Sequence, residues 1–136
     1  MTHHKSRLQF KKGIYKIYFT CRDANNRSHI GSVDIDFENN FSIENISKTP
    51  ILSPGELGLF DDSGVAMGYL IEINNKKMLY YLGWNLKVTV PWLNTIGLAV
   101  YNNKTHIFEK ISKAPLLDRS HHDPFTISYP SILFDD

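Results

Sequence analysis

Hydrophobic and polar residues alternate over short stretches along most of the chain, a pattern typical of half-exposed β-strands. Residues 15–20 read Tyr-Lys-Ile-Tyr-Phe-Thr, and such aromatic and β-branched residues favour strands. Asparagine pairs, which are typical of turns, separate the stretches at 25–26, 39–40, 74–75 and 102–103. No stretch combines a sustained helical spacing of apolar residues with capping residues at its ends. The pattern therefore predicts an all-β protein.

The same segments occur twice along the chain in the same order. The offset between matched positions grows from 62 to 66 residues, which we attribute to a longer loop around Lys87 to Leu93 in the second copy. The matched pairs are 17–20 with 79–82, 28–35 with 94–101 (Gly31 with Gly97), and 46–52 with 111–117. We interpret the chain as a tandem duplication.

Each copy is expected to contain four strands, and a repeat of about 60 residues with four strands is typical of β-propeller blades. The predicted strands are 7–10, 14–20, 29–36 and 41–47 in blade one, 63–73, 77–83, 95–101 and 106–112 in blade two, and Phe125 to Phe134 in a third. The boundaries are about 7–52, 61–117 and 123–136, within one incomplete domain over 1–136. A self-contained β-sandwich of about nine strands is the alternative.

An incomplete propeller has a physical consequence. A closed ring needs about four to eight blades, so two blades and one strand leave a sheet face and an edge uncovered. We therefore expect these residues either to belong to a longer or split protein or to assemble with another chain.

The composition of the chain excludes several classes of function. The chain has 136 residues and 42% hydrophobic residues, enough for one packed domain. Its net charge of +1 offers no electrostatic footprint for nucleic acid or an anionic membrane. The longest apolar stretches, such as 65–71, are too short to span a bilayer, and the N-terminus lacks a secretory apolar region, so a cytoplasmic protein is expected.

The sequence predicts neither a metal nor a cofactor. Cys21 is the single cysteine, which excludes an internal disulfide and a multi-cysteine zinc site, and we expect it to be a small buried filler. Neighbouring histidines in a strand point to opposite faces, so the pairs at 3–4 and 121–122 each offer one ligand to a given site. No Gly-rich phosphate loop or nucleophile elbow is present.

Four segments carry a more specific signal. Residues 55–65 read Gly-Glu-Leu-Gly-Leu-Phe-Asp-Asp-Ser-Gly-Val and residues 80–91 contain Gly-Trp-Asn; the others are 20–23 (Thr-Cys-Arg-Asp) and 117–125, with Leu-Asp-Arg-Ser and Asp-Pro-Phe. Together they resemble bacterial proteins related to glycoside hydrolases, often encoded among surface-polysaccharide genes. These proteins are similar to the five-bladed β-propeller clan of family 43, family 32 and levansucrase-type enzymes. The resemblance implies a partial five-bladed propeller and a carbohydrate substrate or ligand.

Glycosidic cleavage generally uses two carboxyl groups that flank the bond, one protonated and one ionised, often with a third that tunes the acid. In the clan these groups lie on the innermost strands of successive blades. Asp61 and Asp62 directly precede the innermost strand of blade two, and Asp123 holds the equivalent place before blade three. We therefore expect all three to point into one funnel as candidate catalytic residues.

The chain also departs from the clan's pattern. The base usually comes from the first inner strand, yet residues 6–10 contain no carboxylate. The acid is usually a Glu of the third blade, where this chain has Ser128 and Tyr129. We therefore expect the 136 residues to be catalytically inactive on their own.

Six further residues are candidates for sugar binding, each beside a structural alternative. Trp84 is able to stack on a sugar face or to pack between blades, and Trp92 has the same two roles open to it. Arg22 and Asp23 form either a substrate-facing pair or a structural one, and Asp61 to Ser63 is either a site or a turn. The six candidates are Arg22, Asp23, Ser63, Trp84, Asn85 and Arg119. The resulting function is glycoside hydrolysis or glycosyl transfer, and the alternative is a non-catalytic sugar-binding or interaction module.

Overall fold

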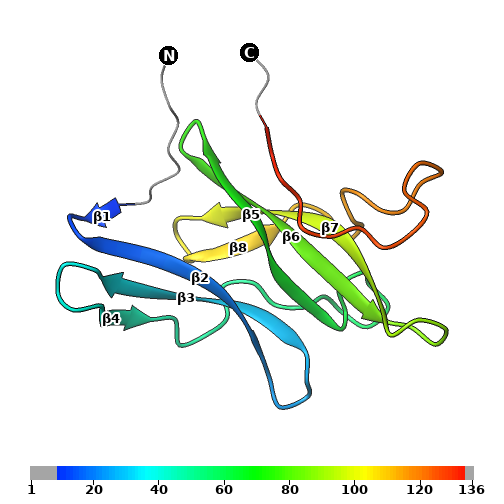
Figure 1. Cartoon of the computed structure of the whole chain (residues 1–136), viewed down its shortest axis with the longest axis horizontal. Coiled ribbons are helices and arrows are strands. Elements are labelled where there is room, and N and C mark those ends of the chain that lie inside the picture. The colour runs from blue at the N-terminus through cyan, green and yellow to red at the C-terminus, as the bar shows by residue number, and fades with distance from the viewer. Residues whose placement is uncertain (1–8, 134–136) are drawn as a thin grey trace.

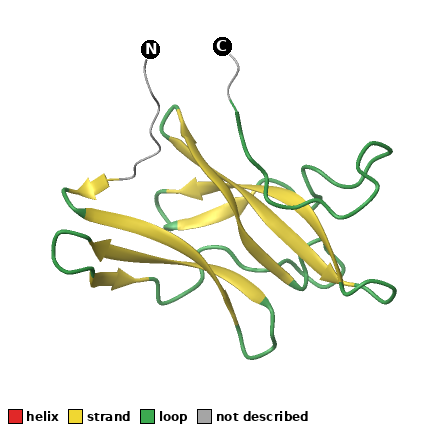
Figure 2. Ribbon diagram, viewed as in Figure 1, coloured by secondary structure: helices red, strands yellow, loops and turns green. Residues whose placement is uncertain are grey.

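The structure, a computed structural model, describes residues 9–133, and these residues form eight β-strands and no helix. The all-β prediction is confirmed (Figure 2). The strands are β1 (Gln9–Lys11), β2 (Ile14–Arg22), β3 (Ser28–Asp36), β4 (Ser42–Ile46), β5 (Gly64–Ile73), β6 (Lys76–Leu86), β7 (Trp92–Asn102) and β8 (Ile107–Lys110).

The strands form two antiparallel units in which each strand pairs with the next along the chain. The first unit is β1 to β4 and the second is β5 to β8. A single parallel pair, Ser28 with Gly64, joins β3 to β5, so the two units make one curled, open sheet (Figure 1). Turn chemistry sets the reversals: Asn74 and Asn75 both have positive φ, as a tight two-residue hairpin requires.

Strand register confirms the duplication. Phe19 pairs with Gly31 in the first unit, and Tyr81 pairs with Gly97 in the second, at the positions that the sequence aligned. In both units the aromatic ring lies so close to the glycine that an added Cβ would collide with it. Isolated bridges repeat as well, joining Ile30 to Leu52 and, in the second unit, Ile96 to Leu117.

The cause of the changing offset is different from the one expected. The β2–β3 and β6–β7 loops have the same length, 23–27 and 87–91. The extra residues instead lengthen the second hairpin by two strand pairs, Asn85 with Leu93 and Leu86 with Trp92. Trp92 and Leu93 are thus strand residues rather than loop residues.

The core lies between the two units. Ile30 and Ile51 of the first unit pack with Leu79, Tyr81 and other buried residues of the second. The backbone also joins the units, because the Phe108 N–H donates a hydrogen bond to the Ile51 carbonyl (2.8 Å). Burial of this shared apolar surface holds the two units in a fixed relation.

The strand predicted from Phe125 to Phe134 is wrong over its described part, because residues 125–133 form no strand. Thr126 and Ser128 bond to Asn94 through their side chains instead of through a regular backbone ladder. Pro130 lacks an N–H for a ladder, and Tyr129 has a positive φ of 53°, so the segment is poorly suited to pairing. It crosses the second unit near β7 (Figure 1).

A bulge in β5 depends on a glycine. Strand register shifts between Ala66 and Tyr69, and a Cβ on Gly68 would lie 2.1 Å from the Tyr80 carbonyl oxygen. The Met67 N–H freed at the bulge bonds to Thr20 Oγ1 (3.0 Å), which ties β5 back to β2.

Residues 9–133 contain no helix of the length and apolar character that crossing a membrane would require.

Candidate functional site

The segment between the two units, residues 53–63, carries both adjacent carboxylates. Because Asp61 and Asp62 are consecutive, their side chains leave the backbone in different directions and meet different partners. The Asp61 side chain is buried at 1% exposure, whereas Asp62 is half-buried. The sequence analysis treated the two aspartates as equivalent, but their different burial gives them separate roles.

Asp61 is the centre of a polar cluster that joins the segment between the units to β6 and β8 of the second unit. Its Oδ2 accepts hydrogen bonds from the Tyr81 hydroxyl (3.1 Å) and from Lys110 Nζ (2.5 Å). Its Oδ1 is buried and has no hydrogen-bond partner among the described residues. Burial and the neighbouring Asp61 carboxylate both raise the pKa of Tyr81, so its hydroxyl stays protonated and remains a donor.

A cavity of about 530 Å³ opens beside this cluster. Asp61 and Lys110 line it, together with the turn at Gly55 and the exposed pair of Glu56 with Lys113 (3.2 Å). An added Cβ at Gly55 would lie 2.3 Å from Asp61 Oδ1, so only glycine leaves this oxygen its space. The cavity thus presents two carboxylates and two lysine cations, of which Asp61 and Lys110 form the inner pair and Glu56 and Lys113 the exposed pair.

Asp62 holds the turn together. Its carboxylate accepts hydrogen bonds from the Gly58 N–H (2.9 Å), the Ser63 hydroxyl (2.9 Å) and the Asn85 amide (2.7 Å). Burial acts to raise the pKa of Asp62, but these hydrogen bonds outweigh it and the pKa is lowered. The Asn85 amide also donates to the Leu59 carbonyl (2.6 Å). Ser63 and Asn85 therefore both bond to Asp62 and hold the turn.

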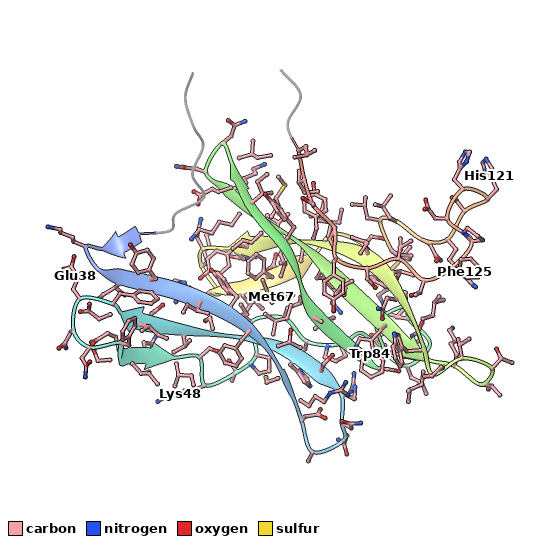
Figure 3. The ribbon with its side chains drawn as sticks, in the orientation of Figure 1. Glu38, Lys48, Met67, Trp84, His121 and Phe125 are labelled. Carbon is pink, nitrogen blue, oxygen red and sulfur yellow. The ribbon has the colours of Figure 1, made fainter. Side chains whose placement is uncertain are left out.

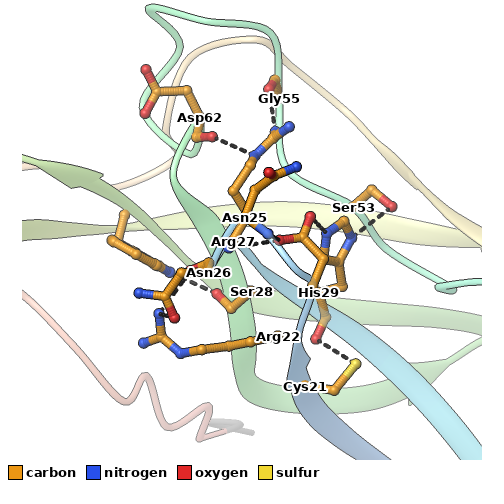
Figure 4. Close-up of polar contacts among 12 residues, drawn as sticks. Cys21, Arg22, Asn25, Asn26, Arg27, Ser28, His29, Ser53, Gly55 and Asp62 are labelled. Atoms are coloured by element: carbon orange, nitrogen blue, oxygen red, sulfur yellow. Dashed lines mark hydrogen bonds and ion pairs between the residues drawn. The ribbon is translucent and has the colours of Figure 1, made fainter.

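Arg27 is a contributor that the sequence analysis missed. Its guanidinium reaches from the β2–β3 loop to the carbonyls of Asp62 (3.1 Å) and Gly55 (3.2 Å), as Figure 4 shows. It fixes the turn that carries both carboxylates to the first unit. Lys110 and Tyr81 were missed as well, since nothing in their local sequence places them beside Asp61.

Arg22 and Asp23 do not pair with each other. Arg22 bonds to the Asn26 carbonyl (2.8 Å) and side chain, while Asp23 lies 3.0 Å from His29 Nε2 (Figure 4). The Asp23 carboxylate also accepts hydrogen bonds from N–H groups of its own loop. The pKa of Asp23 is lowered, chiefly by the hydrogen bond with His29 and further by these loop bonds. The neighbouring Cys21 is exposed, so the expectation of a buried filler is wrong.

Trp84 lies where the two units join. Its Nε1–H donates to Ser28 Oγ (2.7 Å), beside the parallel contact of Ser28 with Gly64. The Arg22 guanidinium covers its ring at 5.3 Å, a cation–π arrangement. Both the indole N–H and one ring surface thus already have protein partners.

Asp123 and Arg119 lie apart from these clusters, on an exposed loop. Figure 3 shows His121 and Phe125, which flank Asp123, projecting at one end of the molecule. The Asp123 backbone bonds to Ser120, and the Arg119 N–H bonds to Asp118. The structure therefore brings Asp61 and Asp62 to one turn and leaves Asp123 on the surface.

The histidines show no metal arrangement. His121 and His122 lie ring against ring, with centroids 3.7 Å apart, so they do not point to opposite faces; the expectation for a strand fails because the segment is a loop. His3 and His4 lie outside the described residues. Within residues 9–133 no three His, Cys, Asp or Glu side chains gather closely enough to hold a metal ion.

The chain is similar in sequence to longer proteins. It is 46% identical over 122 residues to an uncharacterized protein of Mycobacterium tuberculosis strain H37Rv, and equally so to one of strain CDC 1551. The match covers 90% of this chain but spans 40% of the length of these relatives. No protein-family model matches the chain.

Proposed function

We propose that this chain is part of a carbohydrate-active β-propeller protein, in which the two four-stranded units are successive blades of a five-bladed ring. Three observations support the proposal: the duplication, the antiparallel order of each unit, and the position of two carboxylates immediately before the first strand of the second unit. The relatives are long enough to contain additional units of this size. Such units would cover the outer sheet faces, where Ile17 of β2 and Tyr69 of β5 are exposed.

The observation that carries the proposal is the unpartnered oxygen of Asp61. A buried carboxylate oxygen without a hydrogen bond is costly, and a ligand hydroxyl entering the adjacent cavity would satisfy it. Lys110 would offer a donor to the same ligand, since its Nζ already faces Asp61. Asp61 is therefore a better candidate than Asp62, whose oxygens are occupied by three donors.

The alternative is a sugar-binding module without catalysis. Acid–base cleavage needs a carboxyl group free to exchange a proton with the substrate. Asp61 is tied to Lys110, and Asp62 is held ionised by its hydrogen bonds. This arrangement favours binding by the chain itself, with any cleavage dependent on residues elsewhere in a longer protein.

Sugar binding and turnover test the proposal. We would titrate the 136-residue chain with a panel of methyl glycosides by ligand-observed NMR and assay the same chain against aryl glycosides. We expect binding without turnover, and Asp61→Asn should weaken the binding about tenfold because a charged acceptor is replaced. Glu44→Gln, the same change at an exposed residue of β4, is the control.

The outcomes separate the two roles. Turnover that is abolished by Asp62→Asn would overturn the expectation of inactivity and assign catalysis to Asp62. Binding that survives Asp61→Asn in a correctly folded variant, checked by near-UV circular dichroism, would remove Asp61 from the site.

A further inference from the structure

A second cavity, a groove of about 620 Å³, lies between the two units and shares no residue with the Asp61 cavity. Lys16, Tyr18 and Asp34 line it from β2 and β3, and Tyr101 and His106 line it from β7 and the β7–β8 turn. Ile51 also lines it, and the hydrogen bond from Phe108 to the Ile51 carbonyl fixes the two walls to each other.

The duplication shows that pairing of the two strands does not itself require these polar residues. In the β2–β3 hairpin Lys16 pairs with Asp34, and Tyr18 pairs with Ser32. The matching pairs of the β6–β7 hairpin, 62 and 66 residues later, are Met78 with Val100 and Tyr80 with Leu98. The second hairpin keeps the same register with Met, Val and Leu at these positions, so hairpin pairing does not itself require the lysine, serine and aspartate of the first copy.

The groove presents a set of donors and acceptors held in fixed positions. Lys16 Nζ lies 2.6 Å from Asp34 Oδ1, and both side chains are at most one-fifth exposed. The Asn45 amide reaches the other Asp34 oxygen at 3.4 Å. Opposite them, the Tyr101 hydroxyl lies 3.3 Å from His106 Nδ1.

The Tyr18 hydroxyl is the feature that points to a ligand. It is buried and has no hydrogen-bond partner among the described residues. Burial, with smaller contributions from Tyr101 and Asp34, raises the pKa of Tyr18 to about 12, so the group remains a neutral donor. A buried donor without an acceptor destabilises the protein unless something enters to accept its hydrogen bond.

We propose that the groove binds one neutral pyranose unit of a glycan, as a site separate from the Asp61 cavity; this inference rests on the proposed carbohydrate function. A carboxylate beside an ammonium and an amide suits adjacent sugar hydroxyls, which both donate and accept. The phenol rings suit the apolar face of the sugar. Lys16 and Asp34 neutralise each other inside the groove, and the other lysine of its lining, Lys48, is exposed, so no unbalanced buried charge selects a charged ligand. The volume lies within the usual range for small-molecule sites.

The test is a titration of the ¹⁵N-labelled 136-residue chain with methyl glucosides, galactosides and mannosides, followed by amide chemical shifts. We expect saturable shifts at Tyr18, Asp34, Asn45 and Tyr101 for at least one sugar. Tyr18→Phe removes only the hydroxyl and should weaken this binding by about fivefold to tenfold. If the Tyr18 hydroxyl takes no part in sugar binding, Tyr18→Phe will leave the titration unchanged, and that result overturns the proposal.

A second variant separates binding from folding by using the duplicate's own residues. Lys16→Met with Asp34→Val installs the residues found at positions 78 and 100. We expect this variant to keep or raise the thermal midpoint, because an apolar pair of similar size often replaces a buried ion pair without loss, and to lose the groove shifts. Lys76→Met with Glu38→Val makes a matched charge change at two exposed residues, and the groove shifts should persist.

The location of the shifts distinguishes this proposal from the proposed function. Saturable shifts confined to residues around Asp61 and Lys110 would overturn the groove and leave the proposed function intact. Shifts in the groove of the wild-type chain that persist in a folded Lys16→Met, Asp34→Val variant would also overturn it. If no sugar shifts any residue saturably, the groove proposal fails, and so does the sugar binding expected of the chain under the proposed function.

Discussion

The two units have the same strand arrangement, but matching residues differ in how deeply they are buried. Leu79 of β6 is completely buried, whereas Ile17, its counterpart in β2, is 36% exposed. Both residues lie on the same face of their unit. In the second unit that face packs against the first unit, while in the first unit it has no neighbouring unit in this chain. The contribution of a duplicated residue to stability thus depends on whether a neighbouring unit covers it, because the hydrophobic effect depends on the area removed from water.

The largest test of this comparison is a pair of truncations. Leu79→Ala should lower the free energy of unfolding by about 4 kcal/mol, because it leaves a cavity in a fully buried site. Ile17→Ala should cost about 1 kcal/mol, because the side chain is already partly hydrated. Urea unfolding followed by tryptophan fluorescence measures both. Equal losses would mean that the outer face of β2 is covered in solution.

The next largest effect on stability is expected from truncating matching polar residues, one in each unit. Lys110→Ala removes the cation beside Asp61 and leaves a buried carboxylate without its partner, which should cost about 3 kcal/mol. Asn45 is the counterpart in the first unit, and Asn45→Ala should change stability by less than about 1 kcal/mol because that residue is exposed. Thermal unfolding of the two variants makes the comparison. A small loss for Lys110→Ala would show that water replaces the lysine beside Asp61.

The glycines that face aromatic rings provide a finer test. A Cβ at Gly97 would lie 2.3 Å from the ring of Tyr81, which is buried and bonded to Asp61, so Gly97→Ala should cost about 2 kcal/mol. At Gly31 the nearest atom is the end of the Phe19 ring at 2.9 Å, which has more room to move. Gly31→Ala should therefore cost about half as much. The reverse order, measured by urea unfolding, would contradict the rigid placement of Tyr81.

The smallest expected effect is on the pH dependence of stability. Since hydrogen bonds lower the pKa of Asp62 in the folded chain, its contribution is complete above the unfolded pKa of about 4 and is lost as pH falls through the lower folded value. Asp62→Asn should flatten the acid side of the stability curve. Unfolding midpoints between about pH 2 and pH 6 measure this, and an unchanged slope would assign the acid sensitivity to other carboxylates.

The candidate site was predictable in part. The adjacent Asp61 and Asp62 stand out in the sequence, and both lie in the turn before β5 as expected. Their different environments were not predictable, because Lys110 and Arg27 approach from strands and loops far along the chain. Asp123 was expected beside them because a third unit was expected to start there, but residues 123–133 form no strand and Asp123 lies on an exposed loop.

Alternation, turn residues and repetition determined the strands, their order within each unit and the matched registers, because these depend on local backbone preferences and on a period of two residues. The tertiary structure alone decided which copy of each face is buried, which oxygen of Asp61 lacks a partner, and that Lys16, Asp34 and Tyr101 line one groove. Those properties arise from contacts between units, and contacts between distant segments depend on packing geometry that no local pattern encodes.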